Sequence, residues 1–201
     1  VLSTDNLIIS RMLGLVIVGI YSNYTLITNA LTTLIEQIFT SLVASVGNFR
    51  VTESNERSIE VFNIIYFIGF WIYGFSCICL LCMFNPFIDL FFGSEFIFSL
   101  PIVLTIVFNF YFTGMRNPTN SYKQAYGLYW QNRYVPIFEI TINLVTSIIL
   151  CKYIGVAGVF LGTIISTLST CFWVEPYILY KHGFKSSMAG YMLTYAKYTA
   201  V

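Results

Sequence analysis

The segment VFNIIYFIGFWIYGFSCICLLCMFNPFI (Val61–Ile88) contains no charged side chain. A helix needs ~20 predominantly apolar residues to cross a hydrocarbon core of ~30 Å, so this segment is long enough to span a bilayer. Phe96–Met115 and Tyr153–Val174 are also free of charge. Met12–Phe49 is interrupted only by Glu36. Several such segments in one chain predict an all-α, polytopic membrane protein.

The composition agrees with a membrane protein. The mean hydropathy is +0.77 and charged residues make up 9% of the chain, whereas soluble domains carry about 25% charge. The net charge of +1 indicates nothing about partners, because the charged residues are confined to connectors, and we expect no nucleic-acid partner. The cysteines at Cys77, Cys79 and Cys82 resemble a metal site, but no histidine or acid accompanies them, so we expect packing roles, no metal and no cofactor.

Polar connectors and prolines divide the chain into six expected helices. The chain begins inside the first of them, which predicts a piece of a longer protein. The turn Arg11–Gly19 and the loop Asn48–Glu60 separate the first three, and Asn85-Pro86 and Asn117-Pro118 are expected to stop the third and fourth. The expected helices cover residues 1–10, 20–47, 61–84, 99–117, 134–153 and 155–180, and residues 181–201 form a basic segment or the start of a further helix.

Six helices that alternate in direction place their connectors on two sides of the membrane, and the basic residues divide unequally between them. One set holds Arg50, Arg57, Arg116, Lys123, Arg133, Lys181, Lys185 and Lys197, and the other holds Arg11 and Lys152. Because basic residues favour the cytoplasmic side, the larger set predicts the cytoplasmic face. Asp89 and Glu95 then lie outside.

Polar residues recur on one face of the second expected helix, namely Asn29, Thr33, Glu36 and Thr40. Glu36 is near the middle of the span, and a carboxyl group at that depth must face protein or water. Two interpretations stay open. Glu36 lines a polar cavity, as a proton or cation site, or it is a protonated group hydrogen-bonded to a neighbouring helix.

The fourth and fifth expected helices carry similar rows of polar side chains. Thr105, Asn109 and Thr113 follow one another at steps of four and lead to Arg116. Glu139, Asn143 and Ser147 have the same spacing. The position of Glu139 close to a helix start also has a simple explanation, since the positive end of the helix dipole stabilises an acid.

Asp5 is an acid in the first expected helix, where Arg11 lies six residues further on. Six residues are about two-thirds of a full circle round a helix, so the two side chains are not expected to pair. Asp5 therefore needs a partner from another helix, or water. Gly158, Gly162 and Ser166 in the sixth expected helix form a small-residue ridge for close helix contact.

Four stretches of the chain resemble bacterial polysaccharide flippases, the O-antigen and capsule repeat-unit exporters of the multidrug/oligosaccharidyl-lipid/polysaccharide superfamily. The most specific is RNPTNSYKQAYGLYWQNRY (Arg116–Tyr134), in which a helix end is followed by NPT and an aromatic GLYW. The others are STDNLIIS (Ser3–Ser10), LGLVIVGIYSNY (Leu13–Tyr24) and IGVAGVFLGTIIS (Ile154–Ser166).

The resemblance implies a transporter of 12 to 14 helices in two lobes that moves lipid-linked oligosaccharide by alternating access. The six expected helices would form the C-terminal lobe. Cavity-facing polar residues would handle the glycan and the diphosphate of its lipid carrier, with Arg116 at the cytoplasmic mouth, where a guanidinium can pair with phosphate oxygens. The candidates for the substrate cavity are Asp5, Asn29, Thr33, Glu36, Asn109, Arg116 and Asn143.

The leading hypothesis is a flippase, not an enzyme, that carries undecaprenyl-diphosphate-linked repeat units across a bacterial inner membrane. Its partners would be the lipid-linked oligosaccharide, membrane lipid and, as a further option, polysaccharide-assembly proteins. One alternative is a drug/cation antiporter of the same superfamily, which favours an aromatic and acidic cavity. Another is an integral-membrane polysaccharide-assembly enzyme, which needs a large outer loop or a catalytic His/Asp/Arg set.

The orientation can be tested with single cysteines in a cysteine-free parent. We expect Ser54→Cys and Gln124→Cys to be shielded from an impermeant reagent added outside, and Ser94→Cys to react, because the basic connectors favour the cytoplasm. Labelling is read by mass shift on intact cells. The reverse pattern at two of these three sites would reject the orientation.

Overall fold

The computed structural model describes residues 2–200, which form helices and no strand. Val1, where the first helix was expected to begin, lies outside the described residues. The helical elements are α1 (Leu2–Met12), α2 (Leu15–Thr52), α3 (Asn55–Phe92), η1 (Ser94–Phe96), α4 (Leu100–Gly114), α5 (Asn117–Ala125), α6 (Tyr129–Asn132), α7 (Val135–Ile154), α8 (Val156–Ser169), α9 (Cys171–Ile178), η2 (Leu179–Phe184) and α10 (Ala189–Ala200).

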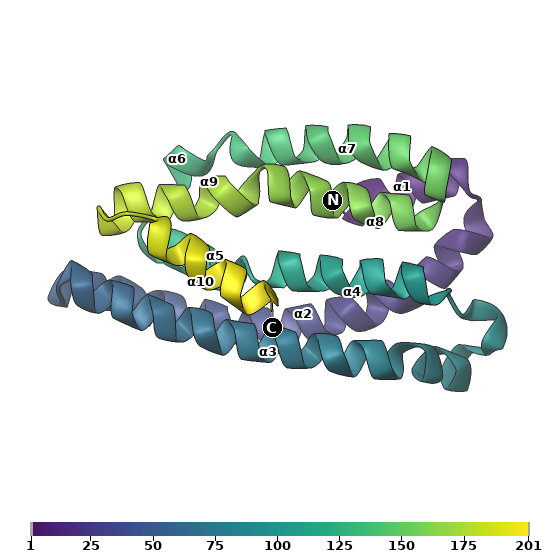
Figure 1. The fold of residues 1–201 in the computed structure, drawn as a ribbon, viewed down its shortest axis with the longest axis horizontal. Coiled ribbons are helices and arrows are strands. Elements are labelled where there is room, and N and C mark those ends of the chain that lie inside the picture. Colours follow the sequence, from purple (N-terminus) through teal and green to yellow (C-terminus); the bar gives the residue numbers. More distant parts are fainter. Residues whose placement is uncertain (1, 201) are drawn as a thin grey trace.

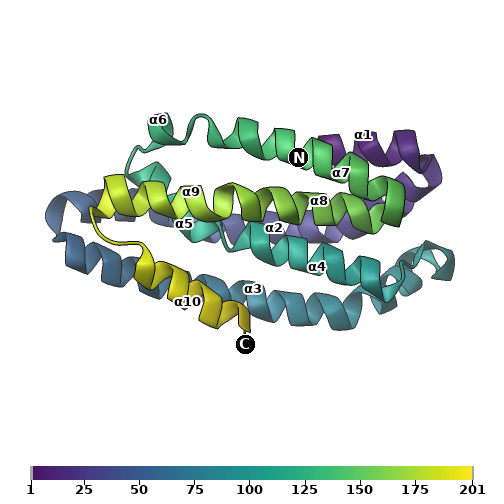
Figure 2. The same cartoon turned by 45° about the horizontal axis from the view of Figure 1, so that its top comes forward.

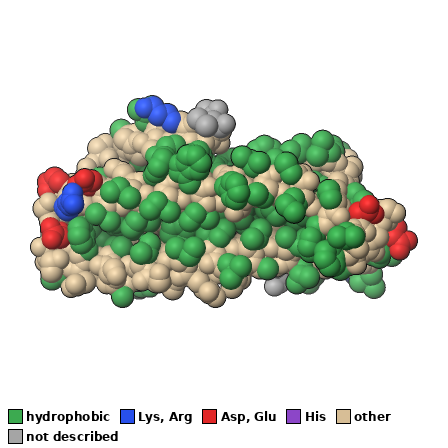
Figure 3. All heavy atoms as spheres, turned by 90° about the horizontal axis from the view of Figure 1, so that it is seen from below, with side chains coloured by type: hydrophobic (Ala, Val, Ile, Leu, Met, Phe, Trp, Pro, Cys, Tyr) green, Lys and Arg blue, Asp and Glu red, His purple; other side chains and the backbone are tan. Residues whose placement is uncertain are grey.

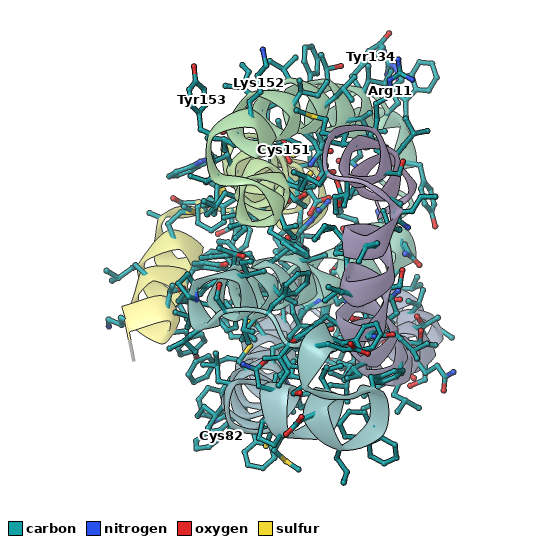
Figure 4. All side chains as sticks on the ribbon, turned by 90° about the vertical axis from the view of Figure 1, so that its right-hand side faces the viewer. Arg11, Cys82, Tyr134, Cys151, Lys152 and Tyr153 are labelled. Atoms are coloured by element: carbon teal, nitrogen blue, oxygen red, sulfur yellow. The ribbon has the colours of Figure 1, made fainter. Side chains whose placement is uncertain are left out.

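The helices run back and forth along one long axis (Figures 1 and 2). The turns between α2 and α3, around α6 and after η2 gather at one end, on the left of Figure 1. The connections α1–α2, α3–α4 and α7–α8 gather at the other end. Arg11 and Lys152 lie at this second end, on α1 and α7 (Figure 4). The two sets of connectors that the sequence predicts are therefore at opposite ends of the bundle.

Four helical stretches are long and apolar enough to cross a membrane, by length and composition: Leu15–Thr52, Asn55–Phe92, Tyr129–Ile154 and Val156–Phe184. At 1.5 Å per residue, the 38 residues of α3 extend over roughly 57 Å, well beyond a ~30 Å hydrocarbon core. Many apolar side chains of α3 point outward, with Trp71 61% and Phe75 67% exposed. Figure 3 shows hydrophobic side chains along the middle of one face and acidic ones at both ends. These features identify a membrane protein.

The prediction of a loop at Asn48–Glu60 is wrong, because this segment is almost entirely helical in the structure. Only Glu53 and Ser54 separate α2 from α3, and the Ser54 hydroxyl accepts a hydrogen bond from the backbone N–H of Arg57 at 3.3 Å. Polar residues such as Glu and Arg are good helix formers, so polarity alone does not end a helix. The polar segment extends the two helices beyond the apolar core. In the same way, the expected turn Arg11–Gly19 shrinks to a break at Gly14, whose φ is 93°.

Pro86 does not stop α3, contrary to expectation. The proline removes one N–H donor, but the preceding Asn85 is fixed by tertiary contacts. Its side chain accepts from the Tyr24 hydroxyl at 2.8 Å and donates to the Phe98 carbonyl at 3.2 Å. The helix instead ends at Gly93, where a φ of 101° suits glycine and the backbone N–H satisfies carbonyls of the last turn.

Asn117-Pro118 begins a helix instead of ending one. Helix α4 starts as expected after Ser99, with Pro101 in its first turn, but it ends at Gly114. Pro118 then occupies the first turn of α5, where a missing N–H donor is no loss. The connector expected over residues 117–133 therefore contains α5 and the short α6.

The expected helix 155–180 is divided at Thr170. Helix α8 ends at Ser169, and the backbone of Thr170 has φ −121° and ψ −82°. The Thr170 hydroxyl donates to the Ser166 carbonyl at 2.6 Å, a contact that competes with regular helix bonding. The segment continues as α9 and η2 as far as Phe184. The expected helix 134–153 agrees closely with α7.

Helix α8 packs directly against the backbone of α7, as the small-residue ridge predicts. A Cβ atom added at Gly158 would lie 2.6 Å from the Cys151 nitrogen, and one at Gly162 would lie 2.7 Å from the Ser147 nitrogen. Ser166 is fully buried. Only residues without a bulky side chain allow the two backbones to approach so closely.

Substitution of Gly162 tests this packing. We expect Gly162→Ala to lower the free energy of unfolding by about 1–3 kcal/mol, because the new methyl group overlaps backbone atoms of α7. The measurement is thermal or denaturant unfolding of the purified protein in detergent. Gly19→Ala is the matched control, because no atom lies within 4 Å of its added Cβ. Equal stability of both variants would contradict the close contact.

Candidate functional site

A cavity of about 240 Å³ lies between α1, α2, α4, α7 and α8, and most of the residues that line it have polar side chains. Only four of the lining residues have no polar side chain, namely Ile106, Phe110, Gly114 and Phe160. The hydroxyl and amide side chains are Thr25, Thr28, Asn29, Thr32, Asn109, Thr113, Asn117, Thr163 and Thr167, and the charged ones are Asp5, Glu36, Arg116 and Glu139.

Helix α2 supplies one wall of this cavity. Thr25, Thr28, Thr32 and Glu36 follow one another at steps of three or four, so they share a face, together with Asn29. Glu36 makes no hydrogen bond or ion pair with any described residue of the chain. The face of α2 that lines the cavity includes Thr25, Thr28 and Thr32 but not Thr33 or Thr40. It is therefore rotated slightly from the predicted polar face.

Two of the predicted cavity residues lie elsewhere. Thr33 is exposed outside the cavity and donates to the Asn29 carbonyl at 2.8 Å. Asn143 is buried between α7 and α8, where its side-chain nitrogen donates to the Thr163 hydroxyl at 2.9 Å. Both residues have the spacing of a polar face. The neighbouring helix decides whether such a residue meets a cavity, lipid or protein.

Asp5 and Asn109 both line the cavity, and each has a buried oxygen without a hydrogen-bond partner among the described residues. Asp5 is 2% exposed and lines the cavity, yet its Oδ1 has no hydrogen-bond partner among the described residues. The Oδ1 of Asn109, another residue that lines the cavity, also has no hydrogen-bond partner among the described residues. Buried oxygen atoms without a partner are costly, so two such atoms in one cavity wall indicate a place where a ligand or water is expected to bind.

Arg116 lies in the short turn between α4 and α5 and joins two buried acids. Its Nη1 donates to Glu139 of α7 at 2.8 Å, and its Nε and Nη2 donate to the two oxygens of Glu175 in α9 at 3.1 and 2.9 Å. Lys123 of α5 approaches Glu175 at 3.0 Å. We refer to Arg116, Lys123, Glu139 and Glu175 as the ionic cluster.

The ionic cluster is enclosed by protein. Glu175 and Lys123 are 3% and 6% exposed, so the ion pair between them is shielded from bulk water. Thr167 adds a hydrogen bond to Glu139 at 3.2 Å. Two acids and two bases compensate one another here, so the cluster ties α4, α5, α7 and α9 together without net charge.

This geometry gives Glu139 and Arg116 roles that the sequence did not reveal. Glu139 is explained by its pairing with Arg116 as well as by its place near a helix start. The guanidinium of Arg116 is directed at two carboxylates of the protein, and a role in binding diphosphate stays a prediction. Glu175 and Lys123 were not predicted from the sequence to be site residues. The position of Glu175 directly after the apolar segment Tyr153–Val174 was a signal that could have identified it.

Cysteines do not form a metal site in the described part of the chain, where no cluster of three His, Cys, Asp or Glu residues is present. Cys82 is exposed on α3, whereas Cys151 is buried on α7, and Figure 4 shows them on opposite sides of the bundle. Comparisons with protein-family models, curated proteins and solved structures gave no match.

Removal of one acid tests the ionic cluster. We expect Glu175→Ala to lower the free energy of unfolding by about 3–5 kcal/mol, because it leaves Arg116 and Lys123 buried with too little negative charge. The control is Glu60→Ala, which removes an exposed ion pair with Arg57 and is expected to have little effect. Both are measured by unfolding in detergent. A small effect of Glu175→Ala would mean that water reaches the cluster.

Proposed function

We propose that this protein is a transporter, not an enzyme, and that it flips undecaprenyl-diphosphate-linked oligosaccharide repeat units across a bacterial inner membrane. The observation that carries the proposal is the chemistry of the cavity wall, in which nine hydroxyl or amide side chains line a space within a largely apolar bundle. Sugar hydroxyl groups need such donors and acceptors once they leave water. The resemblance of four sequence motifs to polysaccharide flippases supports the same function.

The chain is proposed to form one lobe of a two-lobed transporter. Its six passes would be α1, α2, α3, α4 with α5, α7, and α8 to η2, with α10 as the start of a further helix. The cavity of about 240 Å³ is smaller than the ~300–1,000 Å³ of typical complete ligand pockets. A second lobe facing this wall would enlarge the site and allow alternating access.

A drug/cation antiporter of the same superfamily is the second candidate. The carboxyl groups of Asp5 and Glu36 favour it, because both residues line the cavity and form no ion pair with a basic side chain in the described part of the chain. The low number of aromatic residues in the wall argues for the glycan, since Phe110 and Phe160 are the two aromatic residues among the described lining residues. Organic cations are commonly bound by aromatic rings, whereas hydroxyl and amide groups suit sugars.

The proposal is tested in a strain that lacks the gene for the full-length protein. We expect lipid-linked repeat units to accumulate on the cytoplasmic leaflet and surface polysaccharide to disappear, because the proposed route for the glycan across the hydrocarbon core is missing. Both are measured by extraction and gel analysis of the glycan. Drug sensitivity with normal surface glycan would instead favour the antiporter.

Two adjacent residues of α2 test whether the cavity takes part. Glu36→Leu should reduce export of surface polysaccharide at least about tenfold at normal protein abundance, because it replaces a polar group of the wall by a hydrocarbon. Gln37→Leu is the matched control, since Gln37 is exposed and lies outside the cavity wall. Normal export by the Glu36→Leu protein would remove this face of α2 from the transport path.

A further inference from the structure

We propose that the cavity selects glycans by charge, so that its substrates carry neutral or amino sugars and no acidic sugars. This inference rests on the proposed function, because it concerns the substrate class of the same site. It follows from three observations on the charges and the hydrogen-bonding groups of the cavity wall.

The first observation is that no basic group of the wall is free to meet an acidic sugar. Arg116 is the sole basic residue among the described residues that line the cavity. Its guanidinium already donates to both oxygens of Glu139 and both oxygens of Glu175. A uronic acid carboxylate would have to displace one of these glutamates, which would leave a buried acid unpaired.

The second observation is that acids remain after this pairing. Glu139 and Arg116 compensate each other, and Lys123 adds its charge to Glu175 outside the wall. Asp5 and Glu36, on helices α1 and α2, then stay as carboxyl groups that form no ion pair with a basic side chain among residues 2–200. The described wall therefore presents two carboxyl groups and no free basic group to a ligand, and like charges repel one another at short range.

The third observation concerns hydrogen bonding. The oxygen atoms that lack partners, Oδ1 of Asp5 and Oδ1 of Asn109, are acceptors. A sugar hydroxyl or an ammonium group can donate to them, whereas an ionised carboxylate has no proton to donate. Asp5 is 2% exposed and is one of the residues that line the cavity, so this acceptor lies in the cavity wall and away from bulk water. Neutral and amino sugars satisfy these atoms, and acidic sugars do not.

The experiment uses the full-length protein in liposomes with three fluorescent undecaprenyl-diphosphate trisaccharides. One is a glucose trimer, and the other two have one glucose replaced by glucuronate or by glucosamine. The lipid and the diphosphate are the same in all three, so only the sugar charge varies. Flipping is read by protection from an impermeant quencher. We expect the glucuronate lipid to move at least about tenfold more slowly than the neutral one, and the glucosamine lipid to move at least as fast.

The variant Glu36→Gln keeps the shape of the side chain and removes its charge. We expect it to narrow the difference between the neutral and the glucuronate lipid severalfold, whereas Glu53→Gln, an exposed acid outside the cavity, should leave it unchanged. Equal rates for the neutral and acidic lipids, or an unchanged difference in Glu36→Gln, would overturn the charge selection. Failure to move any of the three lipids would instead overturn the proposed function, and the inference with it.

Discussion

The partly buried guanidinium of Arg116 is the contact on which the arrangement of this bundle depends. It lies at the junction of α4 and α5 and donates to acids from α7 and α9, so four helical elements meet at one charge. Within a membrane the helices gain little from burying apolar surface, because lipid is equally apolar. Polar contacts and close packing then decide which helices are neighbours. Breaking such a contact leaves a charge without compensation in a medium of low dielectric constant.

Close packing provides the second constraint, and it complements the ionic cluster. Gly158 and Gly162 let the backbone of α8 lie against that of α7, and Asn143 and Ser147 of α7 bond to α8 across the contact. The face of α7 that carries these residues is thereby closed. The face of α2 that carries Asn29 and Glu36 has no such neighbour and stays open as a cavity wall. The same helical spacing of polar residues thus has two different outcomes.

The charged groups of the ionic cluster and those of the cavity wall have different roles. The ionic cluster uses both bases near the cavity to hold acids of the protein, so its charges serve the fold. The acids that are left, Asp5 and Glu36, line the cavity together with Asn109, and buried oxygens of Asp5 and Asn109 have no partner among the described residues. A site that presents acceptors and negative charge suits hydroxyl-rich or amino-bearing molecules, which is the basis of the proposed substrate class.

The sequence by itself determined the helical, membrane-spanning character of the chain, because long apolar segments admit no other structure in lipid. It also predicted that Asp5, Asn29, Glu36, Asn109 and Arg116 belong together, and all five line one cavity. Helix ends were less predictable. Pro86 lies within α3 and Pro118 begins α5, because tertiary contacts and position in the first turn decide what a proline does.

Only the tertiary structure decided the partners of the polar groups. Spacing along one helix fixes which side chains share a face, but not what that face meets. Thr33 and Asn143 therefore lie outside the cavity. The ionic cluster is completed by Glu175 and Lys123, which come from other helical elements than Arg116 and Glu139. The physical reason is that the energy of a charge or a polar group in a membrane depends on its neighbours from other helices.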